Sequence, residues 1–202
     1  MKTAAQAMKS KQFIKNELDA RIPKRESDAL WEKAERRLDE IMKEHAKIPK
    51  GEHTHTDTYI FPSAAIYLTL KEALDKKTAY AVIEDAAIKK TTDAGKKIAG
   101  MMKLPGMKSL FIWIWGPLTK KMFGSDSGFK NVFYPRKKGE YRMDIVECPY
   151  NRYFTVLGCP ELTKIFCEND NRTYGNLPGL EFKRSGTLGT GADRCDFYVR
   201  KL

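Results

Sequence analysis

The 202-residue sequence has no long hydrophobic run, because no stretch approaches the roughly 20 apolar residues that a membrane-spanning helix needs. Its N-terminus, MKTAAQAMKSKQF, also lacks the apolar central run of a secretory signal peptide. These two absences predict a protein with no integral membrane segment and a cytoplasmic location.

Cysteine is scarce as well. Four cysteines in 202 residues are too few for a disulfide scaffold, and none of them forms a C-x-x-C pair. Zinc ribbons use such close pairs, whereas these cysteines are spaced 11, 8 and 28 residues apart. We therefore expect free thiols, no bound metal and no other cofactor. A metal site assembled from distant segments, with Asp170 or His53 contributing, stays open.

Acidic residues are outnumbered, and the formal net charge is +11. The surplus is shared by both parts of the chain, with +7 before and +4 after residue 127, and it is interleaved with acids. A nucleic-acid binder more often has a dense basic stripe with aromatic residues beside it, so no nucleic-acid partner is predicted. A lysine-rich surface of this kind does attract small anionic molecules.

The first 127 residues show mainly helical spacing. Leu30, Leu38 and Ile41 recur at intervals of three to four and predict a helix from Ser27, as N-cap, to about Lys47. Further helices are expected over residues 1–20, from residue 62, over residues 80–102 and over the apolar run 110–115. We interpret that last run as a buried helix. The alternatives are that Trp113 and Trp115 lie on a membrane surface or cover a ligand pocket.

Beyond residue 128 the pattern changes to alternation. Strands are predicted near residues 129–134, 141–146, 180–184 and 196–200, with short helices near 149–158 and 160–169. The predicted fold is α+β, with about five N-terminal helices packed on a C-terminal four-stranded antiparallel sheet that carries two short inserted helices. The division is a helical region, 1–127, and a sheet region, 128–202, or one single domain.

A polar segment with two histidines precedes the third predicted helix. His53, His55 and Asp57 alternate, so an extended chain would present them on one face, where they could bind a divalent metal. A polar connecting loop is the favoured interpretation.

All four cysteines lie between residues 147 and 199, together with acids, an arginine and a glycine cluster. A thiolate can act as a nucleophile, and Cys167 is the stronger candidate because Glu168 and Asp170 accompany it. Cys195 is the second candidate, since the neighbouring Arg194 could lower its pKa. Each thiol could instead be a small buried apolar group.

Four segments of the chain, FPSAAIYLTLKEA, CPY, LGCPELTKIFCEND and LEFKRSGTLGTGADRCDFYV, resemble the L-2-amino-thiazoline-4-carboxylic acid hydrolase family over about residues 55–200. The resemblance implies hydrolytic opening of a cyclic amidine, a small-molecule substrate, on a route from aminothiazoline carboxylate to cysteine. The order of the C-terminal elements is also similar, as a fold, to four-vinyl-reductase-type domains. A non-catalytic small-molecule or metal-binding module is therefore the alternative function.

Such a substrate has an anionic carboxylate and a cationic amidine. A guanidinium suits the first and a carboxylate the second, while hydrolysis needs a thiolate or an activated water. The predicted catalytic residues are Cys167, Cys195 and Asp170. The predicted substrate-binding residues are Arg184, Asp196, Thr187 and Cys148. The sequence leaves the oligomeric state open, with a homodimer as one arrangement.

Overall fold

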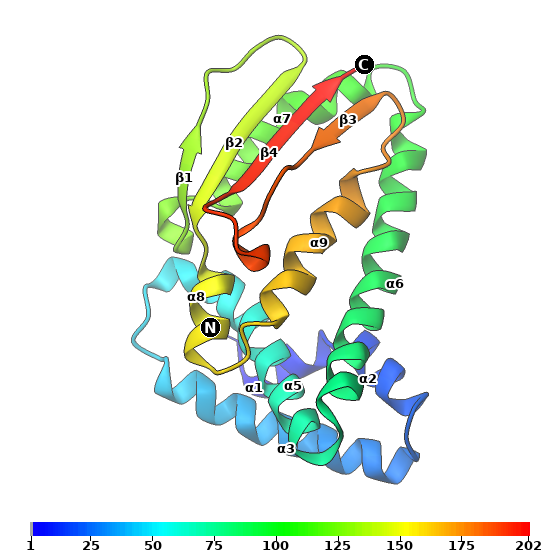
Figure 1. Ribbon diagram of the computed structural model, residues 1–202, viewed down its shortest axis with the longest axis vertical. Helices are drawn as coiled ribbons and strands as arrows, with labels where there is room; N and C mark the ends of the chain where they lie inside the picture. Colours follow the sequence, from blue (N-terminus) through cyan, green and yellow to red (C-terminus); the bar gives the residue numbers. More distant parts are fainter. Residues whose placement is uncertain (1) are drawn as a thin grey trace.

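The computed structural model describes residues 2–202, so Met1, the first residue of the predicted helical region, lies outside the described residues. Helices fill the lower half of the molecule, and the four strands form a sheet in the upper half (Figure 1). The predicted α+β fold is confirmed. The helices before the sheet are α1 (Ala4–Lys9), α2 (Gln12–Asp19), α3 (Lys24–Glu44), α4 (His53–His55), α5 (Phe61–Ala73), α6 (Lys76–Met102) and α7 (Met107–Met122).

The sheet consists of β1 (Lys130–Phe133), β2 (Glu140–Glu147), β3 (Leu180–Lys183) and β4 (Cys195–Lys201). All neighbours are antiparallel, in the order β1-β2-β4-β3. Two predicted helices, α8 (Pro149–Val156) and α9 (Leu162–Tyr174), are inserted between β2 and β3. One-turn helices flank these elements: η1 (Lys50–Glu52), the π-helix η2 (Thr56–Ile60), η3 (Ser125–Ser127) and η4 (Leu188–Thr190).

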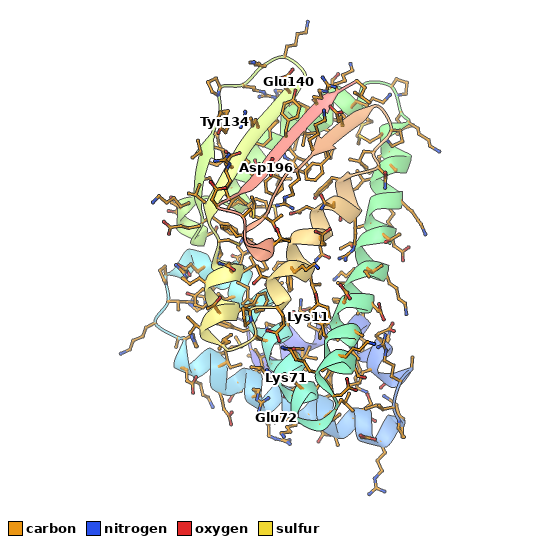
Figure 2. The ribbon with its side chains drawn as sticks, viewed as in Figure 1. Lys11, Lys71, Glu72, Tyr134, Glu140 and Asp196 are labelled. Carbon is orange, nitrogen blue, oxygen red and sulfur yellow. The ribbon has the colours of Figure 1, made fainter. Side chains whose placement is uncertain are left out.

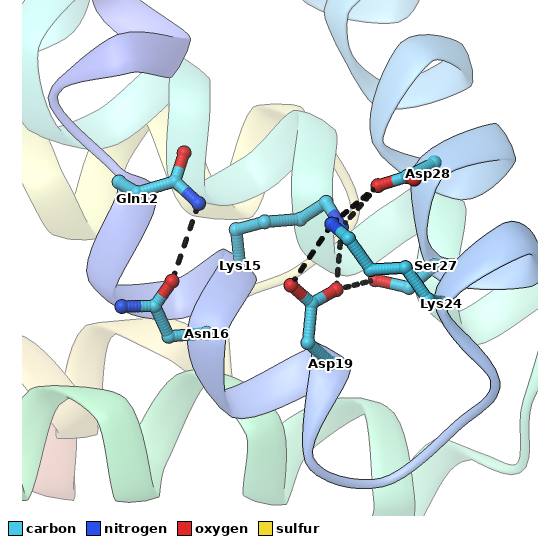
Figure 3. A network of polar contacts seen from close by, with 7 residues as sticks. All are labelled: Gln12, Lys15, Asn16, Asp19, Lys24, Ser27 and Asp28. Atoms are coloured by element: carbon cyan, nitrogen blue, oxygen red, sulfur yellow. Dashed lines mark hydrogen bonds and ion pairs between the residues drawn. The ribbon is translucent and has the colours of Figure 1, made fainter.

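Two local predictions are wrong. The helix predicted over residues 1–20 is divided into α1 and α2, and Ser27 is not an N-cap because α3 begins three residues earlier, after Pro23. Ser27 is buried instead, where Lys15 Nζ donates to its Oγ at 2.8 Å and to Asp28 Oδ1 at 2.7 Å (Figure 3). The same network includes Asp19, which accepts from Ser27 Oγ at 2.5 Å, so it fastens α2 to α3.

The segment with two histidines is also different from the predicted loop. It forms successive 3-10, α and π turns from residue 50 to residue 60. In this conformation His53 Nδ1 lies 3.1 Å from Asp57 Oδ1, while His55 is buried and points to other parts of the chain. The alternating face that a metal site would need therefore does not form.

The pleat of β2 and β4 sorts their side chains between two faces. Tyr141 pairs with Val199, Met143 with Phe197 and Ile145 with Cys195. These buried side chains share one face, since side chains alternate along a strand. Helix α7 covers this face, behind the sheet in Figure 1, and its Thr119 hydroxyl lies 2.5 Å from the Tyr141 hydroxyl.

Two hydrophobic clusters fill the interior. One joins α1–α3, α5 and α6 to α8 and α9, and the other joins the sheet to α7 and to the C-terminal parts of α6 and α9. Each cluster takes residues from both sides of residue 127. The long helix α6 contributes to both, so it connects the two halves (Figure 1). The division into 1–127 and 128–202 stays a prediction.

Helix α7 is buried on one side only. Ile112, Trp115 and Thr119 face the sheet, whereas Trp113 is 61% exposed. The expectation of a buried helix therefore holds for half of its surface. Across residues 2–202, no helix combines the length and the apolar character that spanning a bilayer requires.

Candidate functional site

A cavity of about 220 Å³ lies where the buried face of the sheet meets α8 and α9. Six aromatic residues line it: Tyr59, Phe123, Phe129, Tyr150, Phe166 and Phe197. The polar groups that reach it are Cys148, Cys167, Asn169, Asp170, Arg184 and Cys195. Five of the seven predicted site residues thus line one cavity, although their roles stay predictions. An apolar pocket with a few convergent polar groups is the usual form of a small-molecule site.

Two cysteines from different elements meet in this cavity. Cys167 lies on α9, and Cys195 is the first residue of β4. Their side chains are hydrogen-bonded to each other, and the Leu188 N–H donates to Cys195 Sγ at 3.2 Å. The η4 turn approaches closely because Gly189 has no side chain, since a Cβ there would lie 2.9 Å from Cys167 Sγ.

The two thiols have opposite pKa shifts. A hydrogen bond from Cys195 lowers the pKa of Cys167, with smaller contributions from the Thr187 side chain, the Gly189 N–H and the Arg184 charge. The same hydrogen bond, together with burial, raises the pKa of Cys195. Because Cys167 receives more donors, it is the thiol of this pair that ionises more readily. A thiolate is the nucleophilic form of cysteine.

Arg184 and Asp170 form a buried ion pair beside the thiols. Arg184 Nη1 donates to Asp170 Oδ2 at 3.0 Å and to the Cys167 carbonyl oxygen at 2.9 Å. The Arg184 side chain is only 4% exposed, and its guanidinium lies over the Phe197 ring, 4.1 Å from the centroid. Its Nε is buried without a hydrogen-bond partner among residues 2–202. A buried donor without a partner is costly, so it is expected where a ligand completes the site.

Asp170 lines the cavity and keeps 29% of its side chain accessible. Burial raises the pKa of Asp170, which the Arg184 charge and hydrogen bond oppose. A carboxyl group whose pKa is raised near a reactive thiol can exchange a proton with a bound molecule at neutral pH.

Cys148 has a different environment. It is the N-cap of α8 and lines the cavity, and burial raises the pKa of its thiol to about 11. At neutral pH this thiol is therefore uncharged. It can contact a bound molecule, but it is not activated as a nucleophile.

The structure does not bring Asp196 to the cavity. Asp196 follows Cys195 on β4, so it points to the opposite face of the sheet (Figure 2). There its carboxylate accepts from the Ser185 and Gly186 N–H groups, each at 2.9 Å. Asp196 thus holds the turn that follows Arg184. Thr187, the remaining predicted residue, is buried and hydrogen-bonds Cys167 from the η4 turn.

A tyrosine that the sequence reasoning missed completes the polar part of the wall. The Tyr150 hydroxyl lies 3.0 Å from His55 Nδ1, and His55 Nε2 lies 2.7 Å from the Met122 carbonyl oxygen. A carbonyl only accepts, so Nε2 carries the proton and Nδ1 accepts from Tyr150. Burial lowers the pKa of His55 and raises that of Tyr150 well above its usual value, so both are neutral.

Tyr150 and Asn169 line the cavity but were not predicted as site residues, and the sequence offers only a weak signal for them. Tyr150 belongs to the CPY segment and Asn169 to the CEND segment, both of which carry the family resemblance. Within residues 2–202, no three His, Cys, Asp or Glu side chains gather as a metal ion would require. His53 and Asp57 lie in a separate surface hollow.

Comparison with known proteins gave one match. The model of the family described as L-2-amino-thiazoline-4-carboxylic acid hydrolase matches residues 53–199, which include every residue of the cavity wall. No curated protein and no solved structure matched the chain.

Proposed function

Since the chain belongs to the L-2-amino-thiazoline-4-carboxylic acid hydrolase family, we propose that it hydrolyses a C–N bond in a small cyclic amidine or related amide at this cavity. Family membership supports a hydrolase assignment, and the substrate and reaction are our proposal. The observation that carries it is the placement of Cys167 and Cys195 beside Arg184 and Asp170 in one aromatic-walled cavity.

The size and charges of the cavity suit an amino-thiazoline carboxylate. Its volume of about 220 Å³ is below the roughly 300–1,000 Å³ typical of pockets for drug-sized ligands. Arg184 binds the substrate carboxylate through the guanidinium edge that Asp170 and the Cys167 carbonyl leave free. Asp170 faces the amidine, while Cys148, Thr187 and the aromatic rings complete the surroundings.

The reaction begins with attack of the Cys167 thiolate on the amidine carbon, which forms a carbon–sulfur bond. The ring C–N bond then breaks, and the nitrogen leaves as an amine after it receives a proton from Asp170, which enters the reaction in its protonated form because burial raises its pKa. Water then adds to the same carbon; one of its protons returns to the Asp170 carboxylate, the other goes to the released amine, and Cys167 leaves again as a thiolate. The sum is addition of one water and release of a carbamoyl product. Throughout the reaction, the Cys195 S–H group donates its hydrogen bond to Cys167 Sγ.

The experiment is turnover of 2-aminothiazoline-4-carboxylate by the purified protein, followed by mass spectrometry of the carbamoyl product. Cys167→Ser should abolish turnover, and Arg184→Lys should raise KM because a lysine cannot form the two parallel hydrogen bonds of a guanidinium. Cys159→Ala is the matched control, since Cys159 is a buried thiol outside the cavity. Wild-type turnover in Cys167→Ser would refute the assignment of the nucleophile.

Saturable binding of the same compound without turnover would instead favour the non-catalytic binding module. Calorimetric titration of the wild-type protein detects this binding, which Arg184→Lys should weaken under either function, and the turnover assay separates the two. Free thiols fit the reducing cytoplasm in which we propose that the protein acts. A homodimer stays a prediction.

A further inference from the structure

The outward face of α7 carries a continuous apolar stripe. Leu110, Trp113, Ile114 and Leu118 follow one another at intervals of three, one and four residues, so they lie on one side of the helix. All four are exposed, and Trp113 has 61% of its surface accessible. The stripe continues onto the edge strand β1, where Phe133 is exposed beside Lys120 of α7.

The opposite face of α7 is already occupied by the sheet and by the C-terminal end of α9. Trp115 packs edge-on against Tyr174, with ring centroids 4.5 Å apart, and Thr119 contacts Tyr141. The helix is therefore apolar on both sides. A helix at the surface of a soluble protein normally has a polar outward face, and a large exposed apolar patch marks an interaction site.

The charges around this stripe have one sign. Residues 96–139 contain ten lysine and arginine residues and one acidic residue, so they hold nine of the eleven net positive charges of the chain. Within residues 2–202, only Lys96 and Lys130 of these ten pair with a carboxylate. Lys120 Nζ lies over the Phe133 ring, 5.3 Å from its centroid, and Arg136 donates to the Trp113 carbonyl at 3.1 Å. The cations thus border the apolar stripe directly.

We propose that α7 docks on the surface of an anionic lipid bilayer, with its outward stripe in the headgroup region. Exposed tryptophan and aliphatic side chains bordered by lysines are typical of a helix that lies in the plane of a membrane interface. Helix α7 lies on the membrane rather than crossing it, because its inward face is held by the sheet and its 16 residues are too few to span.

A second copy of this chain is a poorer occupant of the same face. A two-fold dimer brings the same patch of both subunits together. Here that would place two surfaces with a net charge of +9 each against one another, with one acidic residue apiece to compensate. An anionic bilayer has the complementary charge and attracts each nearby lysine or arginine by about 1 kcal/mol.

The test is co-sedimentation of the full chain with vesicles of phosphatidylcholine alone and of phosphatidylcholine mixed with phosphatidylserine. Binding is expected only to the mixed vesicles, and it should weaken as salt is added. The double variant Lys120→Gln/Lys121→Gln should weaken binding by roughly 30-fold. Trp113→Ser should weaken it by about tenfold.

Val156→Ser and Lys164→Gln are the matched controls, because both side chains are exposed on α8 and α9, away from α7. They should bind as the wild type does. Absence of binding to the mixed vesicles overturns the proposal. So does binding that Trp113→Ser leaves unchanged, or a self-association without lipid binding that Trp113→Ser abolishes.

Discussion

The chain contains one thiol that should be ionised at neutral pH and three that should not. Hydrogen bonds, led by that from Cys195, lower the pKa of Cys167 to about 6. Burial raises the pKa of Cys148 to about 11 and that of Cys159 to about 12. With an ordinary thiol pKa of about 8.5, only about 3% of a cysteine is thiolate at pH 7, whereas a pKa of about 6 gives about 90%.

This 30-fold gain in thiolate does not give a 30-fold gain in rate. Nucleophilicity falls with pKa at a Brønsted slope of about 0.4–0.5, so a thiolate whose pKa is lowered by about 2.5 units is intrinsically about tenfold slower. The rate at pH 7 should therefore rise only about threefold. The midpoint of the rate against pH is the sharper measurement, because it reports the pKa itself.

The assay is pulse alkylation with iodoacetamide at a series of pH values, read by mass spectrometry after trypsin digestion. The chain suits it, since each cysteine falls on its own tryptic peptide: residues 143–152, 153–164, 165–172 and 195–200. The 165–172 peptide should be modified with a midpoint near 6. The others should react only at alkaline pH or after unfolding.

Two variants test the cause of the shift. Cys195→Ala removes the main donor, so the midpoint of Cys167 should rise towards its ordinary value. Cys195→Ser keeps a hydroxyl donor and should leave the midpoint low. The reasoning fails if the wild-type midpoint of Cys167 is 8.5 or above, or if Cys195→Ala leaves it in place.

Two further predictions concern stability and the η4 turn. Burial lowers the pKa of Lys11 to about 7, so the unfolded chain binds that proton at higher pH than the folded one, and the stability involved is present at alkaline pH and lost as pH falls to 7. In urea titrations at pH 7, Lys11→Met should have a higher free energy of unfolding than the wild type. This gain should shrink by up to about 1.4 kcal/mol per pH unit towards pH 10. A gain that is independent of pH, or the same gain in the exposed control Lys9→Met, would contradict this. Gly189→Ala should slow both the alkylation of Cys167 and turnover, because the added Cβ would collide with Cys167 Sγ. Gly100→Ala is the control, since a Cβ there meets nothing within 4 Å, and it should keep both rates at the wild-type level. Equal effects of the two substitutions would show that Gly189 has no special role.

The sequence predicted the helices and strands well where one face is simply apolar. The spacing of Leu38 and Ile41 predicted α3, because burial of these side chains on one helix face depends on spacing alone. Apolar spacing did not predict the conformation of the segment around His55. Its helical turns are completed by Tyr150 and the Met122 carbonyl, which are 95 and 67 residues away along the chain. A polar segment that is buried through distant partners has the composition of a loop, so no local pattern could distinguish the two.

The site could be predicted only where the local backbone determines the direction of a side chain. Cys195 and Asp196 are neighbours on one strand, and a one-residue step reverses the face of the sheet. Both could therefore not line the same cavity, and this could have been argued from the alternation alone. Which of the two faces inward depends on the cover that α7 and α9 provide. Since Cys195 pairs with Ile145 and lies with Phe197 under those helices, the sulfur is inside and the carboxylate outside. Arg184, one residue beyond the end of β3, reaches the cavity because Asp196 accepts the N–H groups of the turn that follows it. The aspartate thus acts on the site through the backbone that positions Arg184, from the far side of the sheet.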